Sequence, residues 1–138
     1  MEQKILFIGL GIMGAPMAKN ILQKDFDVAV CDIDRNVVNN FKEIVSIAST
    51  KPSEAADRRN VIVMMLPNSD VVNAVLFCEG GALETCAPNS LFVDMSTGSY
   101  PKMMKIAKRV AGLGHRFVDA PVGRTPREAI TGDLLVMA

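Results

Sequence analysis

Three glycines near the start of the chain have the spacing of a loop that binds a dinucleotide. Gly9, Gly11 and Gly14 form a Gly-x-Gly-x-x-Gly pattern that includes Ile12 and Met13. In such a loop the first glycine permits a tight turn, the second lets the backbone approach a pyrophosphate, and the third lets a helix pack close to a strand. The phosphates then lie at the helix N-terminus, where unpaired N–H groups and the helix dipole favour negative charge.

A carboxylate follows these glycines at the distance that a dinucleotide site requires. Asp32 lies 18 residues after Gly14 and directly follows the apolar run 28–31. A carboxylate about 20 residues beyond the loop accepts hydrogen bonds from the ribose hydroxyls of adenosine. Because it also repels a 2′-phosphate, Asp32 favours NAD(H) as the cofactor. Arg35 could accept that phosphate, so NADP-dependent reduction stays open as an alternative.

The residues beside the glycines predict the two elements that position such a loop. The apolar run 5–8 favours a buried strand directly before Gly9. Past Gly14, apolar residues recur at the three-and-four spacing of a helix, at Met17, Ala18, Ile21 and Leu22. A glycine pattern without this context often marks a turn that binds nothing. Here the glycines lie between a strand and a helix, as a binding loop requires.

Strand and helix patterns alternate along the rest of the chain. We expect further strands at 28–31, near 47, and at 61–65, 91–93, 117–118 and 134–137. We expect helices at about 36–41, 52–56, 70–76 and 102–111. Such alternation predicts an α/β fold of the Rossmann type, a doubly wound and mainly parallel sheet with right-handed crossovers. Residues 1–138 are expected to form this one nucleotide-binding domain.

Composition sets the size and class of the protein. Its 138 residues fit one domain that buries a substantial core. A hydrophobic content of 49% with 5% aromatic residues suits aliphatic strands covered by helices. The 15 basic and 15 acidic residues balance, so no net charge attracts nucleic acid or an anionic membrane. No signal segment or long apolar run is present, and we expect a cytoplasmic protein.

The cysteines do not have the pattern of a metal site or a disulfide framework. Cys31, Cys78 and Cys86 are odd in number and lack the Cys-x-x-Cys spacing, and His115 is the single histidine. We therefore expect reduced structural thiols and no bound metal.

Polar clusters follow several predicted strands. They are Gly9–Gly14, Asp32, Leu66-Pro67-Asn68, Asp94-Met95-Ser96-Thr97 and Val122-Gly123-Arg124-Thr125. In open α/β sheets, ligands bind beyond the carboxyl ends of the strands. We therefore expect one crevice to collect all five clusters.

In this order, these clusters resemble the β-hydroxyacid dehydrogenase family, which includes 3-hydroxyisobutyrate dehydrogenase and tartronate semialdehyde reductase. The segment 7–17 matches the family's cofactor loop, and Met65-Leu66-Pro67 and Asp94-Met95-Ser96-Thr97 match its next two motifs. The resemblance covers essentially the whole chain. It implies reversible hydride transfer between NAD(H) and a small hydroxy acid or aldehyde acid.

The resemblance also implies roles for individual residues. Leu66 and Pro67 would border the cofactor, and Thr97 would contact it near the reacting end. Ser96 would hydrogen-bond the substrate. Serine and threonine at strand ends otherwise often cap helices, so these roles depend on the family motifs.

One motif departs from the usual family pattern. Most members carry Ser-Gly-Gly after Asp-Ala-Pro-Val, whereas this chain has Gly123-Arg124-Thr125. The stretch is similar to that of the sulfolactaldehyde reductase branch, whose substrate carries a sulfonate. A guanidinium offers full charge and a fork of donors to such an oxyanion. We therefore expect these three residues to bind an anionic substrate, the alternative being that Arg124 only points into solvent from a loop.

The resemblance leaves the catalytic group outside this sequence. The family depends on a lysine in the long helix after this domain, and an all-helical domain closes the cleft and forms the dimer. The sequence stops at Ala138, before either feature, and Lys102, Lys105 and Lys108 do not match that motif. We expect a piece of a longer homo-oligomeric enzyme that is inactive alone. A non-catalytic dinucleotide-binding module is the alternative.

Overall fold

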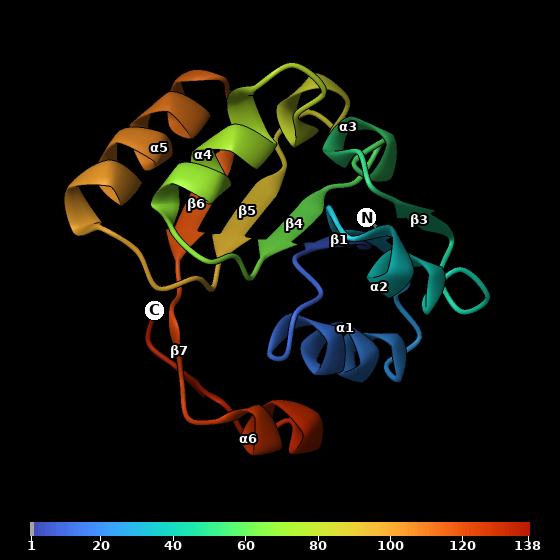
Figure 1. Ribbon diagram of the computed structural model, residues 1–138. Helices are drawn as coiled ribbons and strands as arrows, with labels where there is room; N and C mark the ends of the chain where they lie inside the picture. Colours follow the sequence, from blue (N-terminus) through green and yellow to red (C-terminus); the bar gives the residue numbers. More distant parts are fainter. Residues whose placement is uncertain (1) are drawn as a thin grey trace.

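A computed structural model describes residues 2–138 and contains a six-stranded, fully parallel sheet in the order β3-β2-β1-β4-β5-β6 (Figure 1). The strands are β1 (Lys4–Ile8), β2 (Asp27–Cys31), β3 (Ile47–Ser49), β4 (Val61–Met64), β5 (Leu91–Asp94) and β6 (Arg116–Asp119). The chain builds outward from β1 on one side and then returns to build outward from β4 on the other. This order confirms the predicted Rossmann-type fold and places a topological switch point between β1 and β4.

Helices cover both faces of the sheet. They are α1 (Gly14–Leu22), α2 (Arg35–Asn39), α3 (Pro52–Ala55), α4 (Ser69–Phe77), the short 3₁₀ helix η1 (Ala82–Glu84) and α5 (Tyr100–Gly112). Because side chains alternate across a strand, Leu6 and Ile8 of β1 join one buried cluster, whereas Ile5 and Phe7 join another. Both faces of β1 are apolar, as expected for a parallel sheet buried on both sides.

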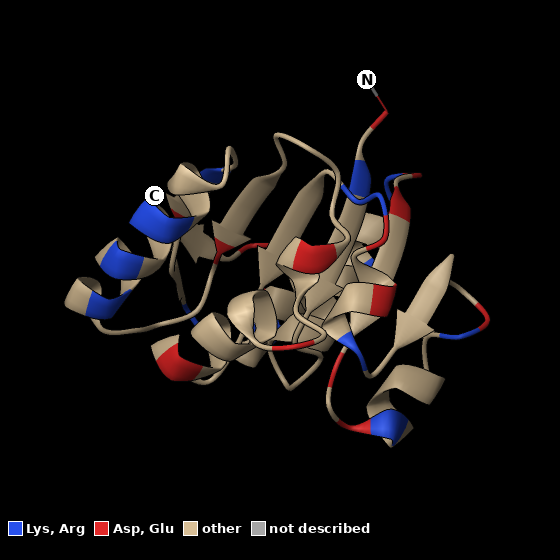
Figure 2. Cartoon of the chain, turned by 90° about the horizontal axis from the view of Figure 1, so that it is seen from above, with Lys and Arg blue, Asp and Glu red and all other residues tan. Residues whose placement is uncertain are grey.

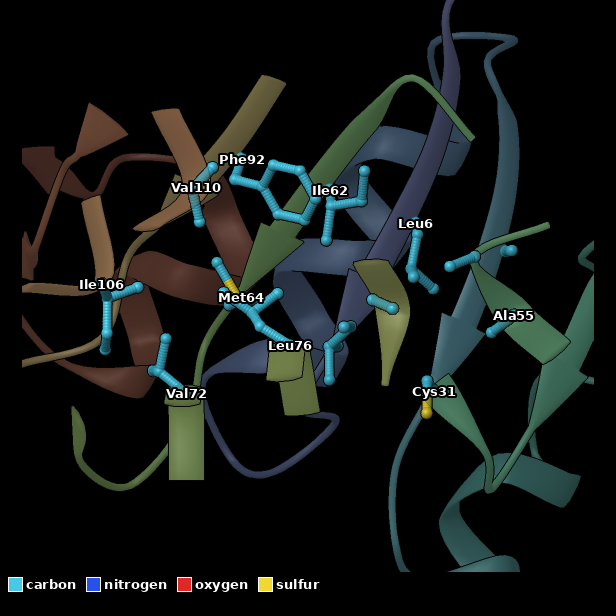
Figure 3. Close-up of a cluster of buried hydrophobic side chains, with 14 of the residues drawn as sticks. Leu6, Cys31, Ala55, Ile62, Met64, Val72, Leu76, Phe92, Ile106 and Val110 are labelled. Carbon is cyan, nitrogen blue, oxygen red and sulfur yellow. The ribbon is translucent and has the colours of Figure 1, made fainter. Parts of the chain in front are cut away.

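The first buried cluster lies under α3, α4 and α5 (Figure 3). Met64 and Phe92 project from neighbouring strands toward Leu76 of α4 and Val110 of α5, and all four are nearly inaccessible to solvent. The second cluster packs Val28 and other strand residues against α1, α2 and the segment around Phe41. These two layers hold the carboxyl ends of the strands in fixed register.

The C-terminal segment forms an arm outside the main sheet. Strands β7 (Val122–Gly123) and β8 (Leu135–Val136) pair antiparallel, and α6 (Pro126–Thr131) lies between them in sequence. A strand is predicted at 134–137, and the structure pairs it with β7 instead of adding it to the six-stranded sheet. Helix α6 rests against α1 (Figure 1), where Ala129 is buried and its carbonyl accepts a hydrogen bond of 2.8 Å from the Asn20 amide.

Basic residues line the outer face of α5, seen in blue at the left of Figure 2. They are Lys102, Lys105, Lys108 and Arg109, and all four are exposed. Lys102 forms an ion pair of 2.9 Å with Asp70 of α4. This face is a basic helix surface exposed to solvent. Among residues 2–138, no helix has the length and apolar character needed to cross a membrane.

A buried arginine ties the amino-terminal edge of the sheet together. Arg59 is 4% exposed, and its Nη1 donates to the Asp27 carboxylate at 2.7 Å while Nη2 donates to Ser46 Oγ at 2.8 Å. Hydrogen bonds from Ser46 and then from Arg59 lower the pKa of Asp27. The network joins the turn before β4 to the start of β2 and the segment before β3.

Candidate functional site

A cavity of about 770 Å³ opens at the carboxyl ends of β1, β2 and β4. Its lining includes all the predicted cofactor residues except Thr97, namely Gly9, Gly11, Ile12, Met13, Gly14, Asp32, Leu66 and Pro67. The structure thus brings together residues from three loops that are up to 58 positions apart in sequence, counted from Gly9 to Pro67. The cavity lies at the topological switch point, where such sheets bind their ligands.

Two of the glycines are required by close backbone approach. Gly9 has φ +99°, and a Cβ there would overlap the Met65 carbonyl oxygen. A Cβ on Gly14 would overlap the carbonyl oxygen of Gly9 itself. These contacts press the start of α1 onto the end of β1 and onto the segment after β4, so the loop has one shape.

The middle glycine faces open space instead. A Cβ on Gly11 would have no neighbour within 4 Å, and Gly11 is exposed at the cavity wall. Among residues 2–138, no hydrogen-bond acceptor contacts the backbone N–H groups of Ile12, Met13 and Gly14. The first turn of α1 has neither an acidic residue nor a side-chain cap. This cradle of free donors at a helix N-terminus fits a pyrophosphate.

Asp32 stands at the rim of the cavity and is fixed by two backbone groups. Its Oδ2 accepts a hydrogen bond of 2.7 Å from the Leu10 N–H, and its Oδ1 accepts one of 2.8 Å from Asp34 N–H. Each carboxylate oxygen can accept a further hydrogen bond. The carboxylate is therefore held at the rim with acceptor capacity left for a pair of ribose hydroxyls.

The cavity also has an apolar part that was not predicted from the sequence. Ile33 is 94% exposed at its edge, and Val71 and Val75 of α4 lie on its wall. The sequence carries only the isoleucine that follows Asp32 as a signal for this wall, and the apolar surface suits a flat ring. Cys31 also lines the cavity, and burial raises the pKa of its thiol to about 12, so it stays protonated.

Ser96 and Thr97 lie beyond the lining of this cavity. Ser96 is 2% exposed, and its hydroxyl accepts a hydrogen bond of 2.8 Å from the Leu66 N–H. Asp94, before it, is fully buried, and burial raises the pKa of its carboxyl against the lowering effect of hydrogen bonds from Ser96. Thr97 is exposed. Ser96 therefore fixes the backbone of the segment that carries Leu66.

The predicted anion-binding residues lie on the C-terminal arm, outside the cavity. Arg124 is exposed in a left-handed conformation, φ +79°, and its Nη1 donates to the Asp133 carbonyl at 2.9 Å. Thr125 caps α6 by bonding to Glu128, while Gly123 ends β7. The expected single crevice therefore collects the first three clusters and leaves Ser96, Thr97 and residues 123–125 outside its walls.

Several curated proteins match nearly the whole chain, and two of them show the relationship. The 3-sulfolactaldehyde reductase of Escherichia coli (strain K12) is 40% identical over 97% of this chain and 45% of its own length. The mitochondrial 3-hydroxyisobutyrate dehydrogenase of Mus musculus is 37% identical over 95% of this chain and 39% of its own length. The chain spans less than half the length of these relatives, and the predicted resemblance to their family is confirmed.

A solved structure gives the same answer for the fold. A 3-hydroxyisobutyrate dehydrogenase from Mycobacterium tuberculosis, solved with L-serine, superposes with a TM-score of 0.88 and 30% identity, over 99% of this chain and 46% of that one. Residues 4–138 match the family described as the NAD binding domain of 6-phosphogluconate dehydrogenase. With the glycine cradle and Asp32 at its rim, the chain belongs to that family of NAD-binding domains.

Proposed function

We propose that this chain is the NAD(H)-binding part of an oxidoreductase that interconverts a small 3-hydroxy acid and its aldehyde acid. The observation that carries the proposal is the cradle at Gly11, where open space meets the free N–H groups that begin α1. When bound, NAD(H) supplies the hydride, and the protein supplies orientation and electrostatics.

The residues of this chain bind and orient the cofactor. The amides of Ile12, Met13 and Gly14 would hold the pyrophosphate, and Asp32 would hold the adenosine ribose. Leu66 and Pro67 would cover the middle of the dinucleotide and keep water from it. The catalytic lysine that the family resemblance implies has no match among Lys102, Lys105 and Lys108, so the chain alone is expected to bind without turnover. Hydride transfer would need a lysine supplied by a helical half like that of the relatives.

For the substrate, we propose an acid with a sulfonate or comparable anionic tail. The 40% identity to a 3-sulfolactaldehyde reductase supports this class. Arg124 also supports this class. The residue is exposed, and its guanidinium donates one hydrogen bond to the Asp133 carbonyl. An arginine has five donors, so the others are free to hold an oxyanion. Ser96, Gly123 and Thr125 would complete the substrate site.

Arg124→Asn tests the role of the guanidinium without straining the backbone, because asparagine tolerates the left-handed conformation found at residue 124. In a protein that includes the helical half, we expect catalytic efficiency with a sulfonate-bearing aldehyde to fall by about tenfold to a hundredfold, the loss of one charge-assisted hydrogen bond. Efficiency with an uncharged short aldehyde should change much less. An equal loss on both substrates would mean that Arg124 only shapes the arm.

The carboxylate of Asp32 predicts a preference for NADH over NADPH. Hydrogen bonds to a charged acceptor contribute about 1.5 to 3 kcal/mol, and the same charge repels a 2′-phosphate. We expect the dissociation constant of NADPH to exceed that of NADH by about tenfold or more. Titration of this chain with both nucleotides measures the ratio directly, and equal constants would refute the preference.

A second candidate, NADP-dependent reduction, is favoured by one observation. A polar groove of about 300 Å³ adjoins the main cavity at Thr50 and is lined by Arg35, Lys42 and Lys51. Glu54 also lines the groove and forms an ion pair of 3.4 Å with Lys51, so Arg35 and Lys42 are the cations that could hold a 2′-phosphate there. If NADPH binds better than NADH, and Arg35→Gln removes that advantage, this candidate replaces the first.

A binding titration followed by an activity assay tests the proposed function. We expect one equivalent of NADH to bind this chain, with NADH-dependent reduction of a short aldehyde acid appearing only when the helical half is supplied. Binding without turnover in that longer protein would favour a non-catalytic module. The cytoplasmic location and the homo-oligomer stay predictions, the latter supported by the exposed apolar residues Leu135, Val136 and Met137 of the arm.

A further inference from the structure

Two buried serines join the segment after β4 to the segment after β5 by reciprocal hydrogen bonds. Ser96, on the second segment, accepts from the Leu66 N–H of the first at 2.8 Å. Ser69, on the first, accepts from the Ser99 N–H of the second at 2.9 Å. Ser69 is 3% exposed, so its hydroxyl has little competition from water. We call this pair of contacts the serine clasp.

A buried carboxylate fixes one side of the serine clasp. Asp94 Oδ1 accepts a hydrogen bond of 3.0 Å from the Ser96 N–H, which closes a tight turn after β5. Met95, between Asp94 and Ser96, donates its N–H to the Met64 carbonyl at 2.8 Å. The turn is therefore closed by the Asp94 side chain and anchored to β4 by the backbone of Met95.

The other side of the serine clasp is a close approach between Gly98 and the Ser69 hydroxyl. A Cβ on Gly98 would overlap the Ser69 hydroxyl oxygen, and it would lie 3.5 Å from Ser69 Cβ and 3.6 Å from Met103 Sδ. The hydroxyl alone would be in the way, because the other two distances are ordinary van der Waals contacts. Thr97 therefore lies between Ser96, which bonds to Leu66, and Gly98 and Ser99, which contact Ser69. The side chain of Thr97 is exposed.

This placement matters for one half of a bound dinucleotide. The pyrophosphate cradle lies after β1, and Asp32, which marks the adenosine side, lies after β2. Because a dinucleotide lies across the switch point, its nicotinamide half would extend toward β4 and β5. Leu66 and Thr97 are on that side, and both are attached to the serine clasp.

We propose that Ser69 is a positioning residue that sets the affinity for the nicotinamide half of the cofactor through Gly98 and Thr97. The proposal rests on the proposed function, because it assumes that NAD(H) occupies the main cavity. Ser69 does not line that cavity, so its effect would pass entirely through the backbone of the segment after β5.

The test compares NADH with ADP-ribose, which lacks the nicotinamide, by calorimetric titration of this chain and three variants. Ser69→Ala should weaken NADH by about threefold to tenfold, the loss of one neutral hydrogen bond. Gly98→Ala should weaken NADH by about tenfold or more, because the new methyl group displaces the segment. ADP-ribose should bind every variant within about twofold of the original chain.

The double variant Ser69→Ala/Gly98→Ala distinguishes displacement from misfolding. Removing the hydroxyl makes room for the new methyl group, so NADH affinity should return to that of Ser69→Ala alone. Unchanged NADH binding in Gly98→Ala would overturn the proposal, as would equal losses for NADH and ADP-ribose or a double variant weaker than Gly98→Ala. Failure of the original chain to bind either ligand would instead overturn the proposed function.

Discussion

Replacing Gly11 with alanine is expected to weaken NADH binding by at least about tenfold while leaving the fold intact. The new methyl group would meet no protein atom within 4 Å, and Gly11 is not among the glycines with positive φ. It would instead project into the open space at the cavity wall that Gly11 lines, where the pyrophosphate is proposed to bind. Losing one or two charge-assisted hydrogen bonds, each of about 1.5 to 3 kcal/mol, corresponds to a dissociation constant raised by tenfold to far more than a hundredfold.

Two other glycines serve as matched controls for this substitution. Gly14→Ala would overlap the Gly9 carbonyl oxygen, so it should cost about 3 kcal/mol of unfolding free energy, the upper range for overpacking. Gly112→Ala on α5 likewise has no neighbour within 4 Å and lies far from the cavity lining. It should leave the affinity for NADH unchanged. The free energy of unfolding should change by no more than about 1 kcal/mol.

Thermal melts and NADH titrations of the three variants separate these effects. The cradle at Gly11 would be excluded as the cofactor site if Gly11→Ala bound NADH as well as the original chain. It would also lose support if Gly11→Ala and Gly112→Ala weakened binding equally.

Removing Asp27 should produce the largest loss of stability among the charged residues. Arg59 is 4% exposed, and Asp27→Ala would leave its guanidinium buried without a carboxylate. Breaking such a pair costs about 3 to 5 kcal/mol. We expect about 3 kcal/mol, the lower end, because the Asp27 side chain keeps 30% exposure and Ser46 still accepts from Nη2.

The exposed pair Lys102–Asp70 provides the control. Its N···O distance of 2.9 Å is similar to that of the buried pair, but its side chains are 54% and 75% exposed. Such surface pairs contribute about 1 kcal/mol or less, so Asp70→Ala should have a small effect. Urea unfolding of both variants gives the comparison, and equal losses would show that burial of Arg59 does not govern the energy.

The pH dependence of stability provides an independent check on Asp27. Its pKa is lowered in the folded chain, so its contribution is complete above the unfolded value of about 4 and is lost as the pH falls through the folded value. The original chain should therefore lose stability more steeply below about pH 4 than Asp27→Ala does. If the unfolding free energies of the two proteins fell equally steeply below about pH 4, this assignment would be contradicted.

The parts of the site that could be predicted are those that depend on residues close together in sequence. The glycine pattern, the strand before it and the position of Asp32 each follow from short-range spacing, and the cavity contains all of them. The order of strand and helix patterns was sufficient for the parallel sheet, because crossover rules leave few arrangements.

The parts that could not be predicted depend on contacts between distant segments. Asn20 holds α6 through Ala129, which is 109 positions away, so no local pattern places the arm against α1. Helix α6 itself had a signal that was missed, since Thr125 and Glu128 form a capping box around Pro126. The role of Ser69 arises from the backbone of Ser99, 30 positions away, and is invisible in sequence.

A crystal structure of this chain with NADH would test the central claim most directly. It should show the pyrophosphate over Gly11 within reach of the Ile12 and Met13 amides, and the adenosine ribose on the Asp32 carboxylate. The nicotinamide half should extend toward Leu66 and Thr97. A dinucleotide bound away from the start of α1, or no binding at saturating NADH, would contradict the account.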